Sequence, residues 1–253
     1  MDTSKIKDKH IAVWFSCGAA SAVAAKLTLD LYGKDNRVSV VNNPIKEEHP
    51  DNQRFLKDVE GWLGFPIESA VRSKYPDQSC EEVWADRKFM SGPMGAPCTL
   101  ELKKKARQEW EKVNKPDYTV LGFTAEEVKR ADRFRLTERD TLLTPLIDAG
   151  FTKEDCFRVL QGDGITLPLI YTLGYPNANC IGCVKASSAT YWNLVRETFP
   201  DVFLSREKQS TEIGAKLAYY KGDRIMLKDL PPDAKGHKLK DYDFECGIFC
   251  EEK

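Results

Sequence analysis

A short apolar segment that opens directly into an alanine-rich one is the feature that most constrains the fold. Residues 11–15 read Ile-Ala-Val-Trp-Phe, and residues 16–21 read Ser-Cys-Gly-Ala-Ala-Ser. Small residues leave the backbone N–H groups at a helix start accessible, and two serine hydroxyls add hydrogen-bonding groups, which together suit a phosphate. The pattern predicts a strand, an anion-binding loop and a helix. The alternative is that the small residues only allow the helix to pack closely on the strand.

Strand-like and helix-like segments alternate through the first half of the chain. β-rich runs are predicted at about 10–15, 37–41, 67–71 and 118–122, and helices at about 20–33, 51–63 and 98–112. Strands that return to one sheet through helices run parallel, with right-handed crossovers. We therefore predict an α/β fold, a three-layer sandwich with a mostly parallel, Rossmann-like sheet.

Ligands of such folds bind at the carboxyl ends of the strands. Ser16 follows the first predicted strand, Asn42 closes the second, and Gly122 and Phe123 follow the fourth. We expect these residues at one edge of the sheet, with an adenine ring between the loops.

The formal net charge of -1 at pH 7 argues against a general affinity for nucleic acids or membranes. With 253 residues, 42% of them hydrophobic, the chain can build a sizeable core as one large domain or as a domain with an appendage. It has no apolar run near the length of a membrane span, and its polar start lacks the apolar region of a secretory signal. The expected location is the cytoplasm, with no membrane partner, and a homo-oligomer is left open.

The character of the sequence changes after residue 140. A helix is expected to begin near Thr152, a glycine-rich turn follows at 162–164, and another helix is expected over 185–198. The segment from about 221 to 243 is rich in Asp, Lys, Gly and Pro, which predicts a mobile tail. The expected division is a nucleotide-binding core over 1–140, a helical, metal-binding region over 141–220 and a tail over 221–253.

Eight cysteines in a chain expected in a reducing compartment indicate metal or redox chemistry before disulfides. Cys180 and Cys183 form a C-x-x-C pair, and Cys246 and Cys250 are close together near the end. The others are single: Cys17, Cys80, Cys98 and Cys156. The C-x-x-C pair can bind zinc or an iron–sulfur cluster, or can act as a dithiol.

The loop at 16–21 matches neither the Walker pattern G-x-x-x-x-G-K-[ST] nor the dinucleotide pattern G-x-G-x-x-G. It resembles the PP-loop, usually S-G-G-x-D-S, with Cys17 at the first glycine and Ala20 at the aspartate. In the family this resemblance implies that the loop aspartate, which is Ala20 here, assists the binding of magnesium pyrophosphate. Its absence modestly favours attack on an already activated nucleotide over ATP cleavage with Mg²⁺.

Further segments follow in an order that resembles the phosphoadenylylsulfate (PAPS) reductase-like family of the PP-loop, or adenine nucleotide alpha-hydrolase, superfamily. They include Ala-Pro-Cys-Thr-Leu-Glu-Leu-Lys at 96–103, Gly-Phe-Thr-Ala-Glu-Glu at 122–127 and Glu-Cys-Gly at 245–247. Residues 48–52 and 144–156 are also similar to family segments. The resemblance implies a HUP-type sheet with a cysteine-rich C-terminal region, and an adenine nucleotide as ligand: PAPS, adenylylsulfate or ATP.

The residues expected to bind the nucleotide belong to these segments. They are Ser16, Gly18, Ser21, Asn42, Lys103, Gly122, Phe123, Arg130 and Arg133. Lysine and arginine offer cations to a polyanionic nucleotide, and arginine suits bidentate phosphate or sulfate contacts.

Two ligand sets for a metal centre are left open. In one, Cys180 and Cys183 join Cys246 and Cys250 around a single metal such as zinc. In the other, which resembles the cluster-bearing reductases, Cys98, Cys180 and Cys183 hold a [4Fe-4S] cluster with one tail cysteine, for which we choose Cys250. Those reductases have a Cys-Cys pair where this chain has Pro97-Cys98, which leaves the fourth ligand undecided.

Cys246 is predicted to be the catalytic residue, because the cysteine of the family's E-C-G segment attacks the sulfur of the bound sulfonucleotide. The first hypothesis is therefore a sulfonucleotide reductase served by a thioredoxin-like reductant. The second is an ATP-dependent sulfur transferase that thiolates nucleic acid through an adenylated intermediate. The third is a non-catalytic nucleotide-binding subunit whose cysteines are structural.

Overall fold

The computed structural model describes residues 6–92 and 95–239, which divide into two compact units. The first unit contains residues 6–44, 50–70 and 107–169. The second contains 45–49, 71–92, 95–106 and 170–239. This division differs from the consecutive regions expected from the sequence, because a long segment from the middle of the chain belongs to the second unit.

The first unit is built on a parallel sheet of five strands in the order β3-β2-β1-β4-β5. The strands are β1 (His10–Phe15), β2 (Arg37–Asn42), β3 (Ile67–Ser69), β4 (Tyr118–Val120) and β5 (Leu142–Leu143). Every neighbouring pair is parallel, and the register sets Phe15 against Asn42 at the carboxyl end. The predicted α/β class and the four predicted strand positions are confirmed.

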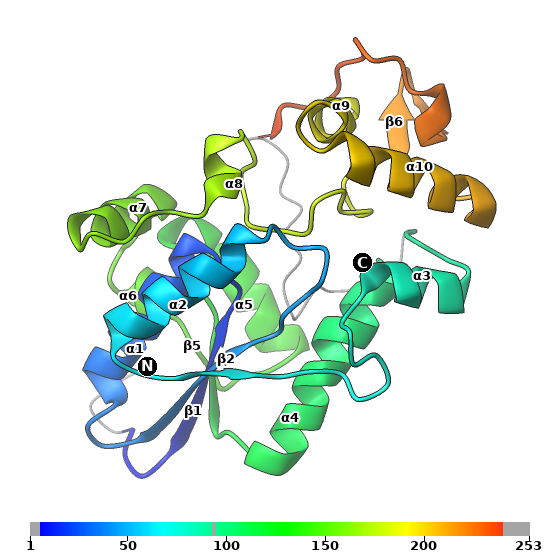
Figure 1. Cartoon of the computed structure of the whole chain (residues 1–253). Helices are drawn as coiled ribbons and strands as arrows, with labels where there is room; N and C mark the ends of the chain where they lie inside the picture. The colour runs from blue at the N-terminus through cyan, green and yellow to red at the C-terminus, as the bar shows by residue number, and fades with distance from the viewer. Residues whose placement is uncertain (1–5, 93–94, 240–253) are drawn as a thin grey trace. The chain divides into compact units, whose positions relative to one another are not determined.

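Helices cover both faces of this sheet (Figure 1). They are α1 (Ala19–Tyr32), α2 (Asp51–Leu63), α4 (Ala106–Asn114), α5 (Val128–Thr137), α6 (Pro145–Asp148) and α7 (Lys153–Gly162), with a 3-10 turn η3 (Ala125–Glu127). Alternate side chains of a strand point to opposite faces. Trp14 of β1 packs on Trp110 of α4, and Phe15 packs on Phe55 of α2, so α4 and α2 lie on opposite faces.

Local chemistry sets the ends of these helices. Thr152 caps α7 in a reciprocal arrangement with Asp155, which is the start expected from the sequence. The α2 helix ends at Gly64, whose φ of 60° is the left-handed conformation that glycine adopts at low cost. The predicted helix over 98–112 is instead a π-helix, η2 (Thr99–Lys105), followed by α4.

The second unit packs helices around an aromatic core. Its elements are α3 (Cys80–Arg87), η2, α8 (Leu169–Thr172), α9 (Ala189–Thr198), α10 (Pro200–Ile213), the antiparallel hairpin β6 (Ala218–Tyr220) and β7 (Asp223–Ile225), and the 3-10 turn η4 (Leu227–Asp229). Trp84, Tyr191 and Trp192 are among its fully buried side chains. The helix expected over 185–198 begins later, at Ala189.

The expectation of a mobile tail from 221 is wrong for residues 221–239. This segment contributes β7 and η4, and Leu227, Leu230 and Ala234 are buried in the core of the second unit. Asn193 of α9 donates hydrogen bonds to the carbonyl oxygens of Pro231 and Ala234, which anchors the segment further. In the part of the chain that the structure describes, no helix is long and apolar enough to cross a membrane.

Candidate nucleotide loop and cysteine cluster

The turn after β1 closes on itself through the two serines predicted to bind phosphate. The Ser16 N–H and the Ser16 hydroxyl donate to Ser21 Oγ at 3.1 and 3.3 Å, and Ser21 Oγ donates to the Gly18 carbonyl at 2.8 Å. Cys17 has a φ of 55°, a left-handed conformation at the position where the PP-loop pattern has glycine. The loop thus forms a tight turn at the start of α1.

The helix that follows presents the electrostatics that an anion needs. Gly18 is the N-cap of α1 and has no side chain with which to cap it, and the first turn carries no acidic residue. The first N–H groups of a helix lack partners within the helix and mark its positive end. Ser16, Gly18 and Ser21 are therefore together at a helix start, as the sequence predicted.

Asn42 supports the loop from the neighbouring strand. Its buried Nδ2 donates to the Phe15 carbonyl at 2.8 Å and lies 3.6 Å from Cys17 Sγ. The amide therefore holds the end of β1 and the first residues of the turn in place. Its position at the sheet edge agrees with the prediction, and its contacts indicate a positioning role.

Gly122 lies against the backbone of the loop. A Cβ atom built on Gly122 would stand 2.7 Å from Ser21 N and 3.0 Å from Ala20 C, closer than real side chains come. Phe123, the next residue, is buried and packs on Phe134 of α5 at 6.2 Å between ring centroids. The 121–124 segment thus reaches the loop, and Phe123 serves packing.

The predicted cations are arranged unequally. Arg130 lies over the Phe123 ring at 5.2 Å and donates to Glu127 at 2.6 Å, while Arg133 is exposed on the same helix. Lys103 belongs to the second unit, where its buried ammonium lies 3.7 Å from Glu48. The structure therefore brings Arg130 and Arg133, and not Lys103, into the unit that carries the loop.

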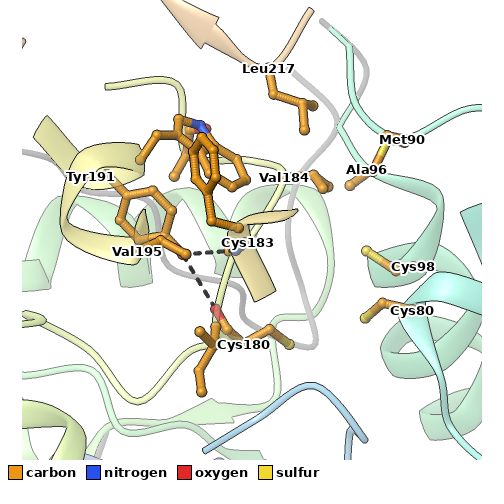
Figure 2. Close-up of a cluster of buried hydrophobic side chains, with 14 of the residues drawn as sticks. Cys80, Met90, Ala96, Cys98, Cys180, Cys183, Val184, Tyr191, Val195 and Leu217 are labelled. Atoms are coloured by element: carbon orange, nitrogen blue, oxygen red, sulfur yellow. Dashed lines mark hydrogen bonds between the residues drawn. The ribbon is translucent and has the colours of Figure 1, made fainter. Parts of the chain in front are cut away.

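Four cysteines of the second unit share one buried cluster: Cys80, Cys98, Cys180 and Cys183. The sulfurs of Cys80, Cys98 and Cys180 turn toward one another (Figure 2). Hydrogen bonds with the Cys180 and Cys98 thiols, together with burial, raise the pKa of the Cys80 thiol well above its ordinary value. Among the described residues, no three His, Cys, Asp or Glu side chains are arranged to hold a single metal ion.

Sequence reasoning missed Cys80, which stands alone in the chain. The pattern of Ser79 with Glu82 three residues later indicates a helix start at Cys80, but no local signal places its thiol beside the other three. Cys246 and Cys250, the predicted nucleophile and tail ligand, lie outside the described residues.

The C-x-x-C turn is held by two buried side chains. The Tyr191 hydroxyl accepts from the Cys183 N–H at 2.7 Å and donates to the Cys180 carbonyl at 3.5 Å. Arg206 donates from Nε to the Gly182 carbonyl at 3.3 Å, stacks over Trp84 and pairs with Glu81. The φ of 66° at Gly182 permits the turn between the two cysteines.

Replacing Tyr191 with phenylalanine is expected to lower the free energy of unfolding by about 1–3 kcal/mol, because the buried Cys183 N–H loses its hydroxyl acceptor. Burial raises the pKa of Tyr191 well above its ordinary value, so the effect should be constant from pH 6 to pH 9. Urea denaturation measures it. The exposed Tyr219 of β6, changed to phenylalanine, is the control; an equal loss in both variants would contradict the expectation.

No protein-family model matches the chain, and no curated protein matches it. Among solved structures, it is similar to PAPS reductase from Candida auris, determined as a phosphate complex, with 11% identity, a TM-score of 0.49 and coverage of 71% of this chain and 84% of that one. It is also similar to a U34-tRNA thiolase from Methanococcus maripaludis, determined with its [4Fe-4S] cluster. The identity is 12%, the TM-score is 0.47, and the match covers 83% of this chain and 71% of that one. These similarities concern the fold alone.

Proposed function

We propose that this chain is an adenine-nucleotide-binding enzyme of the PAPS reductase-like type that reduces a sulfonucleotide, PAPS or adenylylsulfate. The observation that carries the proposal is the turn at Ser16–Ser21, which joins a left-handed Cys17 to a helix start with glycine at the N-cap, at the carboxyl edge of the sheet. Backbone N–H groups in such a turn bind phosphate or sulfate oxygens without a lysine. The ordered sequence segments that resemble this family support the same assignment.

The cysteine cluster supports a resident [4Fe-4S] centre in this proposal. Its donors are thiols in an apolar surround, the soft ligands that iron–sulfur clusters use. A four-iron cluster takes four thiolate ligands, and this buried cluster contains four thiols. Cys98, Cys180 and Cys183 would hold it, and it would supply delocalised charge and a covalent tie between their segments.

Cys246 is the proposed nucleophile. Its thiolate attacks the sulfur of the bound nucleotide, so that an S–S bond forms while the bond from sulfur to the phosphate oxygen breaks. The adenine nucleotide leaves with that electron pair, and the enzyme retains a thiosulfonate. A dithiol reductant of thioredoxin type then releases sulfite and is oxidised to its disulfide. Arg130 and Arg133 are the cations proposed to face the leaving phosphate.

Sulfite release from PAPS or adenylylsulfate, with thioredoxin under anaerobic conditions, tests this proposal. The variant Cys246→Ser should lose activity by about 10³-fold or more, because the attacking thiolate is gone. The control is Cys156→Ser, in a thiol of α7 whose pKa burial raises to about 12, and it should retain activity.

The alternatives give different products. Cleavage of ATP to AMP and pyrophosphate that depends on RNA or DNA, without sulfite from either sulfonucleotide, would contradict the reductase and favour nucleic-acid thiolation. Nucleotide binding without turnover of any of these substrates would favour the non-catalytic subunit.

A further inference from the structure

We infer that Cys80, and not a cysteine of the C-terminal tail, is the fourth thiolate of the iron–sulfur centre beside Cys98, Cys180 and Cys183. This inference rests on the proposed function, because it assumes that the centre is a cluster. Cys80, Cys98 and Cys180 come from three separate segments of the chain, and their sulfurs turn toward one another (Figure 2). All four thiols belong to the same buried cluster.

The start of α3 fixes the position of the Cys80 thiol. Cys80 is the first residue of α3, directly after the N-cap Ser79, whose hydroxyl accepts from the Glu82 N–H. The Glu47 carboxylate accepts from the Cys80 N–H, so the start of the helix is held by hydrogen bonds on both sides of the thiol. These hydrogen bonds fix where the Cys80 thiol lies in the buried cluster.

Glu47 ties the Cys80 segment to the C-x-x-C turn. Its carboxylate accepts from the Cys80 N–H and from the Ser79 hydroxyl, each at 2.8 Å. Its backbone carbonyl accepts from the N–H of Ile181, between the two cysteines of the turn, at 2.9 Å. One residue therefore sets the distance between Cys80 and the predicted ligand pair.

Glu101 connects Cys80's helix with the segment of Cys98. Glu101 lies in η2, the π-helix that begins directly after Cys98. Its carboxylate pairs with Arg87 in the last turn of α3. Two residues, Glu47 and Glu101, thus align the start and the end of α3 with the other ligand segments. The fold itself supplies a fourth sulfur, which leaves Cys246 available for chemistry.

The test compares alanine variants of the full chain after anaerobic reconstitution with iron and sulfide. The readouts are iron and acid-labile sulfide per chain and the Mössbauer and electron paramagnetic resonance spectra. Wild type should hold about four of each. Cys80→Ala should lose the cluster or convert it to a three-iron form, as Cys98→Ala should, whereas the double variant Cys246→Ala/Cys250→Ala should keep the wild-type content and spectra.

A full four-iron cluster with wild-type spectra in Cys80→Ala would overturn the inference, and so would loss of the cluster in the tail double variant. Wild type that binds no iron and sulfide, or zinc alone, would overturn the proposed cluster itself, so the two failures are distinguishable.

Circular dichroism of the metal-free proteins checks the fold. If Cys80→Ala does not fold, the near-isosteric Cys80→Ser decides, because an oxygen ligand changes the Mössbauer parameters of its iron. Cys156→Ala is the matched buried control.

Discussion

Replacing Gly122 with valine is expected to reduce adenine-nucleotide binding at least about 100-fold while leaving most of the chain folded. The nearest atoms to a Cβ at this position are backbone atoms of Ser21 and Ala20, the closest at 2.7 Å, and backbone cannot swing aside as a long side chain does. The start of α1 must move, and the hydrogen bonds that join Ser16, Gly18 and Ser21 must break. In catalytic sites a misplacement of about 1 Å lowers the rate by about this factor, and we expect a comparable loss of affinity here.

Isothermal titration with adenylylsulfate, PAPS and ATP analogues measures this loss. The control is Gly61→Ala in α2, where an added Cβ meets nothing within 4 Å and a helix interior favours alanine over glycine. Gly61→Ala should bind as wild type does. Unchanged affinity in Gly122→Val would show that the nucleotide does not depend on this loop.

Replacing Glu101 with alanine is expected to lower the free energy of unfolding by about 3 kcal/mol. The Glu101 carboxylate is fully buried, pairs with Arg87, lies 2.8 Å from Lys105 Nζ and 3.6 Å from Arg72 Nε. Removing one side of a buried ion pair costs about 3–5 kcal/mol, and solvent reaches Arg87 and Lys105, which favours the lower figure. The same change should weaken cluster binding, because Glu101 aligns α3 with the segment of Cys98.

The contribution of Glu101 should also depend on pH. Burial raises the pKa of its carboxyl, but Lys105 and Arg87 outweigh burial and hold that pKa below its ordinary value of 4.5. The stabilisation is therefore complete above pH 4.5 and is lost as the pH falls through the lower pKa of the folded state.

Urea denaturation of wild type, Glu101→Ala and Glu101→Gln between pH 3 and pH 8 measures both effects. Glu101→Gln keeps the shape without the charge and should lose part of the stability at neutral pH, and the gap to wild type should narrow in acid. A gap that is independent of pH would contradict the ion-pair explanation.

Much of the first unit could be predicted from the sequence because its signals are local. Residues 11–15 are an apolar run that ends in small residues, and β1, the turn and α1 form there as expected. The span predicted for α2 agrees with Asp51–Leu63, since its pattern of apolar residues is strongly periodic. Of the residues predicted at the sheet edge, Ser16, Asn42 and Gly122 lie there because strand ends of a parallel sheet share one edge.

The second unit was harder to predict because contacts distant in sequence define it. Cys80 carries no motif, and only packing places its thiol beside those of Cys98 and Cys180. Residues 221–239 read as a tail by composition, yet the hairpin and three apolar side chains hold them in a core. A few buried side chains outweigh a polar average, because the hydrophobic effect acts on the area buried by particular residues.

By itself the sequence determined that this chain forms a parallel α/β sheet with a tight turn between its first strand and first helix, because strand, turn and helix preferences act over a few residues. It also indicated that the cysteines carry chemistry. Only the tertiary structure decided which thiols share one buried cluster, and that Asn42 and Gly122 shape the turn. These relations depend on distances between segments far apart in the chain, which packing sets and local preference does not.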